Sequence, residues 1–177
     1  MLYGFDVSTP STPALKWRVG CPNLADDTGC TAGFTGIGQT WSFPNVARIK
    51  GHNSGNDPVI VMGGGYDACE DADNSSPSCG SAKGRKVYVI DAGSGTLLKS
   101  FNTVRSVAAD VTLVDQDFDG LVDHAIVADT GGNLYRIDFV DPATRLPLSV
   151  GSWAIYHIAR TNNPVAAGRK FQFAPAA

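Results

Sequence analysis

The residues best suited to chemistry stand in one short acidic run, which begins at Asp115 and reads Asp-Gln-Asp-Phe-Asp-Gly-Leu-Val-Asp. Aspartates hold positions 1, 3, 5 and 9 of this run. Gly120 at position 6 permits the sharp turn that lets the carboxylates converge on one centre. Oxygen ligands of this kind are hard, so the run predicts a Ca²⁺ site and disfavours zinc or copper. The expected ligands are four carboxylates and one backbone carbonyl, those of Asp115, Asp117, Asp119, Asp123 and Leu121.

The acidic run differs from an EF-hand at its end. An EF-hand places a bidentate glutamate at position 12, but Ile126 stands there and belongs to the next expected strand. The run therefore predicts a nine-residue loop between two strands, in which Asp123 takes the bidentate role. A solvated acidic turn is the alternative. However, carboxylates roughly 5 Å apart would repel by about 3 kcal/mol per pair at an effective dielectric of about 20.

The four cysteines form two local pairs, each inside a stretch rich in Gly, Pro, Asp, Asn and Ser. Such stretches cannot pack a core, and no cysteine has the C-x2-C or Cys/His spacing of a zinc site. We therefore expect disulfides and an oxidising compartment. Three connectivities are open, and the one that closes the shortest loops joins Cys21 to Cys30 and Cys69 to Cys79. Four reduced thiols in a cytosolic protein are the alternative.

A repeated strand pattern positions these loops. The motif apolar-Tyr-x-apolar-Asp occurs at residues 2–6, 87–91 and 134–138, each time followed by a polar turn and a second short strand with an aromatic residue. Upstream of the last two copies lies a further matching pair of apolar segments, 46–49 with 59–62 and 111–114 with 125–128. Four short antiparallel strands repeated in series are typical of a β-propeller blade.

The sequence thus predicts an all-β fold, a partial or modified β-propeller with about two full four-stranded blades and flanking strands. Disulfide-stapled insertions at residues 20–40 and 66–85 interrupt it. The expected division of the single domain 1–177 is the end of one blade (1–20), a blade (41–101), a blade with the calcium loop (105–157) and the start of another (158–177). An ordinary β-sandwich with similar hairpins is the competing fold.

Composition excludes several classes of function. Lys and Arg number 14 against 17 Asp and Glu, a net charge of −3, so no basic surface is expected for nucleic acid. No apolar stretch is long enough to span a membrane, and the first residues do not read as an export signal. Because disulfides need an oxidising compartment, we expect a fragment of a longer exported protein. No nucleophile, acid or base stands in a catalytic pattern, so we expect no enzyme.

The succession of motifs resembles the C-terminal propeller of the PilY family, the tip-associated adhesins and biogenesis factors of bacterial type IV pili. The residues that carry the resemblance are 38–49, 59–67, 87–95, the acidic loop 115–123, and 132–138. The resemblance implies a modified propeller at the cell surface or pilus tip, minor pilins as partners, and adhesion to a host or abiotic surface. It also implies a Ca²⁺ switch that supports pilus biogenesis and twitching motility by opposing retraction. The cysteine insertions depart from the family pattern.

Two other classes of propeller stay open. The acidic loop between strands also resembles integrin-type repeats, which would make the chain a generic extracellular binding module. In such proteins each blade carries the loop, whereas the equivalent segment here, 50–57, has one carboxylate. The turn at 91–96 resembles the repeat of pyrroloquinoline-quinone dehydrogenases, but their catalytic aspartate and vicinal cysteine pair have no counterpart.

Overall fold

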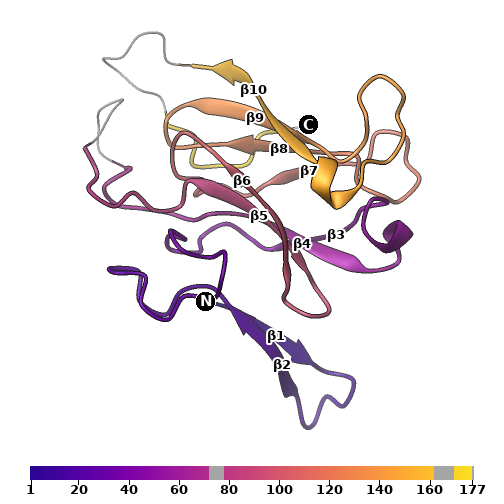
Figure 1. Ribbon diagram of the computed structural model, residues 1–177, viewed down its shortest axis with the longest axis horizontal. Coiled ribbons are helices and arrows are strands. Elements are labelled where there is room, and N and C mark those ends of the chain that lie inside the picture. The colour runs from indigo at the N-terminus through magenta and orange to yellow at the C-terminus, as the bar shows by residue number, and fades with distance from the viewer. Residues whose placement is uncertain (72–77, 162–169, 177) are drawn as a thin grey trace.

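The computed structural model describes residues 1–71, 78–161 and 170–176, and its regular structure is nearly all antiparallel β-sheet (Figure 1). An N-terminal hairpin is formed by β1 (Leu2–Asp6) and β2 (Ala14–Val19). The first four-stranded sheet has the order β3 (Asn45–Arg48), β4 (Pro58–Gly63), β5 (Lys86–Asp91) and β6 (Leu97–Asn102). The second has the order β7 (Thr112–Val114), β8 (His124–Ala128), β9 (Asn133–Asp138) and β10 (Ala154–Arg160). Two short 3-10 helices occur in these residues, η1 (Asn53–Gly55) and η2 (Val150–Ser152).

These sheets confirm the predicted all-β architecture of two four-stranded units and a flanking hairpin. Within each sheet, strands that are consecutive in the chain are neighbours in space and run antiparallel. The turn between β5 and β6 is the polar turn expected after the second copy of the motif. Asp91 Oδ1 accepts hydrogen bonds of 2.7 Å from the backbone N and the hydroxyl of Ser94, and Gly95 takes a positive φ of 75°.

The two four-stranded sheets stack face to face, and hairpin β1–β2 projects from one side of the stack (Figure 1). Because both inner faces are buried, alternate residues of the central strands are apolar and almost fully enclosed. From the first sheet these are Val59, Val61, Val87 and Val89, and from the second Ala125, Val127, Tyr135 and Ile137.

The opposite face of the first sheet packs against the first disulfide insertion, which we call insertion 1 (residues 20–40). Ile60, Met62, Tyr88 and Ile90 of the sheet meet Phe34 of insertion 1, whose ring stacks on Tyr88 with centroids 5.0 Å apart. The repeated tyrosines, Tyr88 and Tyr135, therefore both face the unit that precedes their own sheet in the chain. This repeated relation is what a propeller requires of successive blades.

The hydroxyl groups of Tyr88 and Tyr135 have different surroundings. We therefore expect substitution by phenylalanine to change stability differently at the two positions. The Tyr88 hydroxyl is buried and has no hydrogen-bond partner in the part of the chain that the structure describes, so its removal should leave stability unchanged or slightly raised. The Tyr135 hydroxyl accepts a 3.0 Å bond from Val104 N and donates a 2.9 Å bond to Asp129 Oδ2. Tyr135→Phe should therefore lower the free energy of unfolding by about 1–3 kcal/mol. Urea denaturation with intact disulfides measures both, and equal losses would contradict the assignment.

Both predicted disulfides are present, Cys21–Cys30 in insertion 1 and Cys69–Cys79 in insertion 2 (residues 66–85). The two insertions lie against each other. Lys83 Nζ donates a 2.6 Å hydrogen bond to Asp27 Oδ2, and this ammonium group holds the pKa of Asp27 below its ordinary value. A 2.8 Å backbone bond from Gly84 N to Gly36 O joins the same two insertions. Another, from Gly38 N to Gly64 O at 2.8 Å, joins insertion 1 to the residue that follows β4.

The glycines of these bonds allow a close approach that larger residues would block. A Cβ added at Gly64 would lie 2.4 Å from Gly84 O, which is a backbone atom and cannot move aside easily. The triple glycine 63–65 thus brings the end of β4 against the backbone of insertion 2.

At the C-terminus, the segment expected to begin another blade, 158–177, lies partly outside the described residues, at 162–169 and 177. Its described end, 170–176, has an irregular conformation, and Phe171 N donates a 3.3 Å bond to Asp129 O. Within 1–71, 78–161 and 170–176, no helix has the length and apolar character needed to cross a bilayer.

Candidate metal centre

The acidic loop, residues 115–123, connects β7 to β8, as the sequence predicts. Two residues take left-handed backbone conformations, Phe118 with φ 61° and Gly120 with φ 87°. Gly120 adopts this conformation without steric penalty, whereas Phe118 is the less common case of a large side chain there. Its ring is 88% exposed, so the conformation curls the loop and leaves the aromatic ring at its solvent side.

The curled loop brings three of the predicted carboxylates together. One ligand oxygen from each of Asp115, Asp117 and Asp123 lies within 4.8 Å of the other two. Backbone N–H groups bind one carboxylate oxygen on each of two of these side chains. Asp115 Oδ2 accepts a 2.9 Å bond from Gly120 N, and Asp123 Oδ2 accepts a 2.8 Å bond from Gln116 N.

Asp115 carries the feature that points most directly to a ligand. Its Oδ1 is buried and has no hydrogen-bond partner in the described chain. A buried carboxylate oxygen without a partner is costly, and a cation shared with Asp117 and Asp123 would satisfy it. The donor set is oxygen only, so the residues present fit a hard divalent ion such as Ca²⁺.

The remaining predicted ligands are placed differently. Asp119 lies outside the group of three, and its Oδ1 accepts a 2.8 Å bond from Leu121 N. Leu121 packs against the backbone of Gly55, where an added Cβ would lie 2.8 Å from a Leu121 methyl carbon. Both residues therefore shape the loop in this structure. Whether Asp119 and the Leu121 carbonyl also bind the ion stays a prediction.

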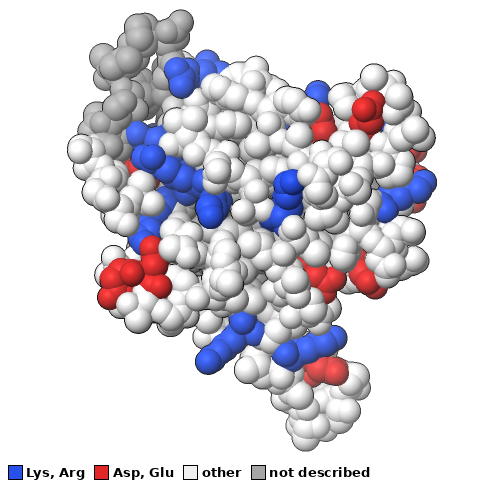
Figure 2. Space-filling view, viewed as in Figure 1, with Lys and Arg blue, Asp and Glu red and all other residues white. Residues whose placement is uncertain are grey.

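The base of the loop is fixed to both sheets. Val122 N donates a 2.8 Å bond to Arg48 O at the end of β3, and Asp123 N donates a 2.9 Å bond to Val114 O. The loop thus bridges the two sheets at the end where η1 lies (Figure 1). The face shown in Figure 2 has a group of basic side chains at the upper left, a group of acidic ones below it, and scattered charges of both signs elsewhere.

Arg145 is a neighbour of the centre that the sequence did not reveal. Its Nη2 lies 3.8 Å from Asp123 Oδ2, and its side chain is 41% exposed. The guanidinium compensates part of the negative charge of the centre from outside the loop. It stands 22 positions after Asp123 in no recognisable motif, so no pattern in the sequence links the two.

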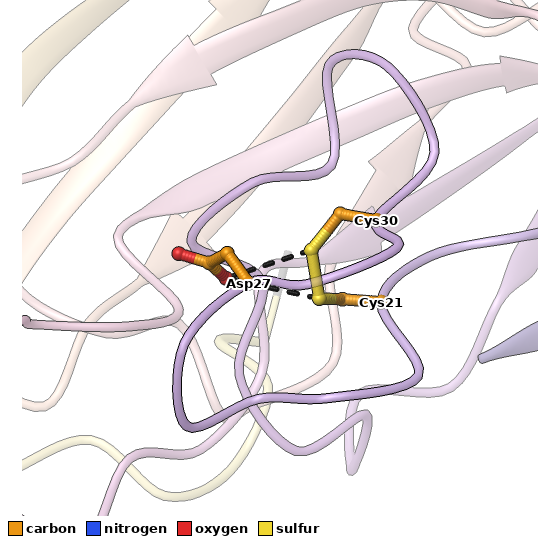
Figure 3. Close-up of side chains that lie close together, drawn as sticks. All are labelled: Cys21, Asp27 and Cys30. Atoms are coloured by element: carbon orange, nitrogen blue, oxygen red, sulfur yellow. Dashed lines mark hydrogen bonds between the residues drawn. A yellow bond between two sulfur atoms is a disulfide. The ribbon is translucent and has the colours of Figure 1, made fainter.

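A second group of metal-ligating residue types, Cys21, Asp27 and Cys30, does not form a metal centre. The two sulfur atoms are joined in a disulfide, as Figure 3 shows, so neither is a thiolate able to bind a metal. Asp27 Oδ1 lies 3.7 Å from Cys21 Sγ and 3.6 Å from Cys30 Sγ. Because its other oxygen binds Lys83, Asp27 here ties the stapled loop to insertion 2.

Comparison with known proteins identifies the family. The crystal structure of the Pseudomonas aeruginosa PilY1 C-terminal domain is similar, with a TM-score of 0.56 and 23% sequence identity. The match covers 85% of this chain but 28% of that one, so the chain spans less than a third of the matched structure. No curated protein matches the sequence. The family described as "PilY1 beta-propeller domain" matches residues 1–149, which confirms the resemblance and the partial propeller fold. The chain belongs to the PilY1 β-propeller domain family.

Proposed function

We propose that this chain is the calcium-binding propeller portion of a type IV pilus protein, which supports pilus biogenesis by opposing retraction. The observation that carries the proposal is the buried, unpartnered Oδ1 of Asp115 beside the carboxylates of Asp117 and Asp123. Membership of the PilY1 propeller family supports the link to the pilus. We place the protein at the cell surface or pilus tip, and the two disulfides support an oxidising, exported location.

Asp115, Asp117 and Asp123 would hold the ion, with Asp119 and the Leu121 carbonyl as the further ligands. When bound, Ca²⁺ supplies the positive charge that lets these carboxylates lie close together. The chain's own contribution is to preorganise them, because Gly120 N and Gln116 N fix one oxygen each on Asp115 and Asp123.

The position of the loop suggests how it could matter beyond its own residues. Val122 N binds Arg48 O, so an ordered loop supports the contact between the two sheets. We propose that the ion stabilises this contact in the propeller. We propose further that the whole protein contacts minor pilins through the propeller. We also propose that the propeller supports twitching motility and adhesion to host or abiotic surfaces. The blade division 1–20, 41–101, 105–157 and 158–177 belongs to the same proposal.

Calorimetric titration of the folded chain with CaCl₂ tests the ion. We expect one site, with loss of the binding heat in Asp123→Ala and in Asp119→Ala. Asp26→Ala is the matched control, because Asp26 is an exposed aspartate whose carboxylate accepts a bond from Thr28 N in a distant turn. Unchanged binding in Asp123→Ala would refute the site.

The pilus role is tested with the full-length protein in a bacterium that makes type IV pili. Asp123→Ala should reduce surface pili and twitching, and pili should return when retraction is also disabled, because the proposed role is to oppose retraction. If the variant loses Ca²⁺ but pili and twitching are unaffected, the chain is better described as a generic calcium-stabilised binding module.

A further inference from the structure

A further cluster of metal-ligating side chains lies where the loop between β3 and β4 meets the end of β5. His52 and Asp57 come from this loop, and Asp91 comes from the end of β5. One ligand atom from each lies within 4.8 Å of the other two. The side chains of His52 and Asp91 are each 16% exposed, so these two residues are largely shielded, whereas Asp57 lies at the solvent side of the cluster.

Neighbouring groups hold both carboxylates of this cluster in place. Asp91 Oδ1 is occupied by the backbone N and hydroxyl of Ser94, which leaves Oδ2 facing His52 Nε2 at 2.9 Å. Asp57 Oδ2 accepts a 2.7 Å bond from Asn53 Nδ2. Outer hydrogen bonds that fix the orientation of ligand side chains are a regular feature of protein metal sites.

The charge of the cluster is unbalanced. Among the described residues, no Lys or Arg nitrogen lies within ion-pair distance of Asp57 or Asp91, and the only candidate cation is the imidazole of His52. The second sheet offers a direct comparison. There His124 Nδ1 lies 2.9 Å from Asp138 Oδ1, and Arg136 binds both oxygens of Asp138, at 2.6 and 2.9 Å.

The cluster in the first sheet thus contains a second carboxylate, Asp57, whereas the His124–Asp138 pair in the second sheet has a guanidinium beside it. A divalent metal ion would satisfy the first arrangement, because it neutralises two carboxylates and uses a neutral imidazole as its third ligand. The mixed set of one nitrogen and two oxygens does not suit Ca²⁺, which takes oxygen ligands, and suits Zn²⁺.

We propose that His52, Asp57 and Asp91 bind Zn²⁺, at a site separate from the acidic loop. Zinc ligands about 2.0–2.1 Å from a tetrahedral ion are about 3.4 Å apart, so His52 Nε2 and Asp91 Oδ2 need to separate by about half an ångström. Three protein ligands leave one position for water or an outside ligand.

The proposed site lies beside the acidic loop. Gly55 of η1 contacts Leu121, and Arg48 O accepts the bond from Val122 N. Zinc would therefore stabilise the β3–β4 loop. This loop lies at the end of the sheets where the acidic loop contacts the first sheet. The two sites differ in ligand chemistry, so each can be filled and tested alone.

The test uses the chain with intact disulfides, stripped of metal with a chelator and then kept in millimolar CaCl₂ to occupy the acidic loop. Titration with ZnCl₂ should show one site, and Co²⁺ should give the visible absorption of a low-coordinate nitrogen and oxygen site. His52→Gln and Asp91→Asn should each weaken Zn²⁺ binding at least tenfold. His157→Gln is the control, since His157 is an exposed histidine on β10. Asp117→Ala should keep Zn²⁺ binding while losing Ca²⁺.

Two outcomes would overturn the proposal. If the native chain binds no Zn²⁺ at micromolar concentration, or if His52→Gln binds as well as the native chain, then His52 and Asp91 form a simple ion pair. If Asp117→Ala abolishes Zn²⁺ binding and His52→Gln does not, the ion sits in the acidic loop. Near-ultraviolet circular dichroism of each variant confirms that a loss of binding does not arise from unfolding.

Discussion

Glu70→Gln is expected to lower the free energy of unfolding by about 3–5 kcal/mol, the range measured when one partner of a buried ion pair is removed. Glu70 is the single glutamate of the chain and is fully buried. Its Oε1 lies 2.5 Å from Arg85 Nη2, and its Oε2 lies 3.0 Å from Arg105 Nε. Without the carboxylate charge, the Arg105 guanidinium, 6% exposed, stays buried with too little negative charge beside it.

Asp71 provides a matched control one residue away. It pairs with Lys170 at 2.8 Å, but its side chain is 33% exposed, so solvent screens the pair. Asp71→Asn should therefore cost less than about 1 kcal/mol. Urea denaturation at neutral pH with intact disulfides measures both variants. If both variants lost similarly little unfolding free energy, the buried ion pairs of Glu70 would not stabilise the fold as its burial indicates.

The expected size of the Glu70 effect follows from what the residue joins. Glu70 belongs to insertion 2, whereas Arg105 and Ser106 belong to the segment that links the two sheets. Ser106 N donates a 3.3 Å bond to Glu70 Oε2, and the Ser106 hydroxyl contacts Thr130 Oγ1 at 2.9 Å. Arg105 N in turn binds Asp129 Oδ2 at 3.0 Å. This buried polar network therefore runs from insertion 2 to the β8–β9 turn and fixes the second sheet relative to the first.

The strands could be predicted from the sequence because their signals are local. The motif apolar-Tyr-x-apolar-Asp and the turn at 91–96 predicted the hairpins. The repetition of four strands predicted the blade-like sheets. The register between repeats was wrong by one residue. Asp91 pairs with Val59 but Asp138 pairs with His124, so Ile60 is equivalent to Ala125. The match of segment 59–62 to segment 125–128 had placed Ile60 at Ile126. A strand buried on both faces is apolar at every position, and its pattern cannot fix the register.

The contacts of the insertions could not be predicted, because they join polar residues far apart in the chain. Nothing near Glu70 in the sequence marks Arg85 and Arg105 as its partners, and nothing near Asp27 marks Lys83. Such pairs have no period, and they form only after the sheets have placed the segments side by side. The cysteine spacing did indicate where the insertions are stapled, since a short disulfide loop is a local feature.

The candidate metal centre could also be predicted only in part. Spacing alone located the loop 115–123, and Gly120 has the left-handed conformation expected of position 6. Spacing did not reveal that the Asp119 carboxylate turns to Leu121 N, or that Arg145 approaches Asp123. Segment 50–57 was set aside because it carries one carboxylate. Asp91, at the end of the neighbouring strand β5, supplies another, and only the fold brings it beside His52.

Removal of the Cys21–Cys30 disulfide, as Cys21→Ala with Cys30→Ala, should destabilise the protein more than removal of Cys69–Cys79. The two bridges close loops of nearly equal length, with sequence separations of 9 and 10. Loop-closure entropy is therefore the same for both, about 2–3 kcal/mol in the chain-entropy model. Their surroundings differ, because Cys21 is buried in the core with Val19 and Phe34, whereas Cys69 is exposed.

Loss of the buried sulfur atoms adds a packing cost of about 1 kcal/mol or more to the first double variant. It also frees the loop that carries Asp27, and with it the 2.6 Å bond to Lys83 that ties insertion 1 to insertion 2. We therefore expect a loss of about 3–5 kcal/mol for the first pair and about 2–3 kcal/mol for the second. Urea denaturation of the two double variants gives the comparison. Equal losses of unfolding free energy would mean that the first disulfide acts only by restricting the unfolded chain. Its burial and the bond from Lys83 to Asp27 would then contribute nothing to the stability of the folded state.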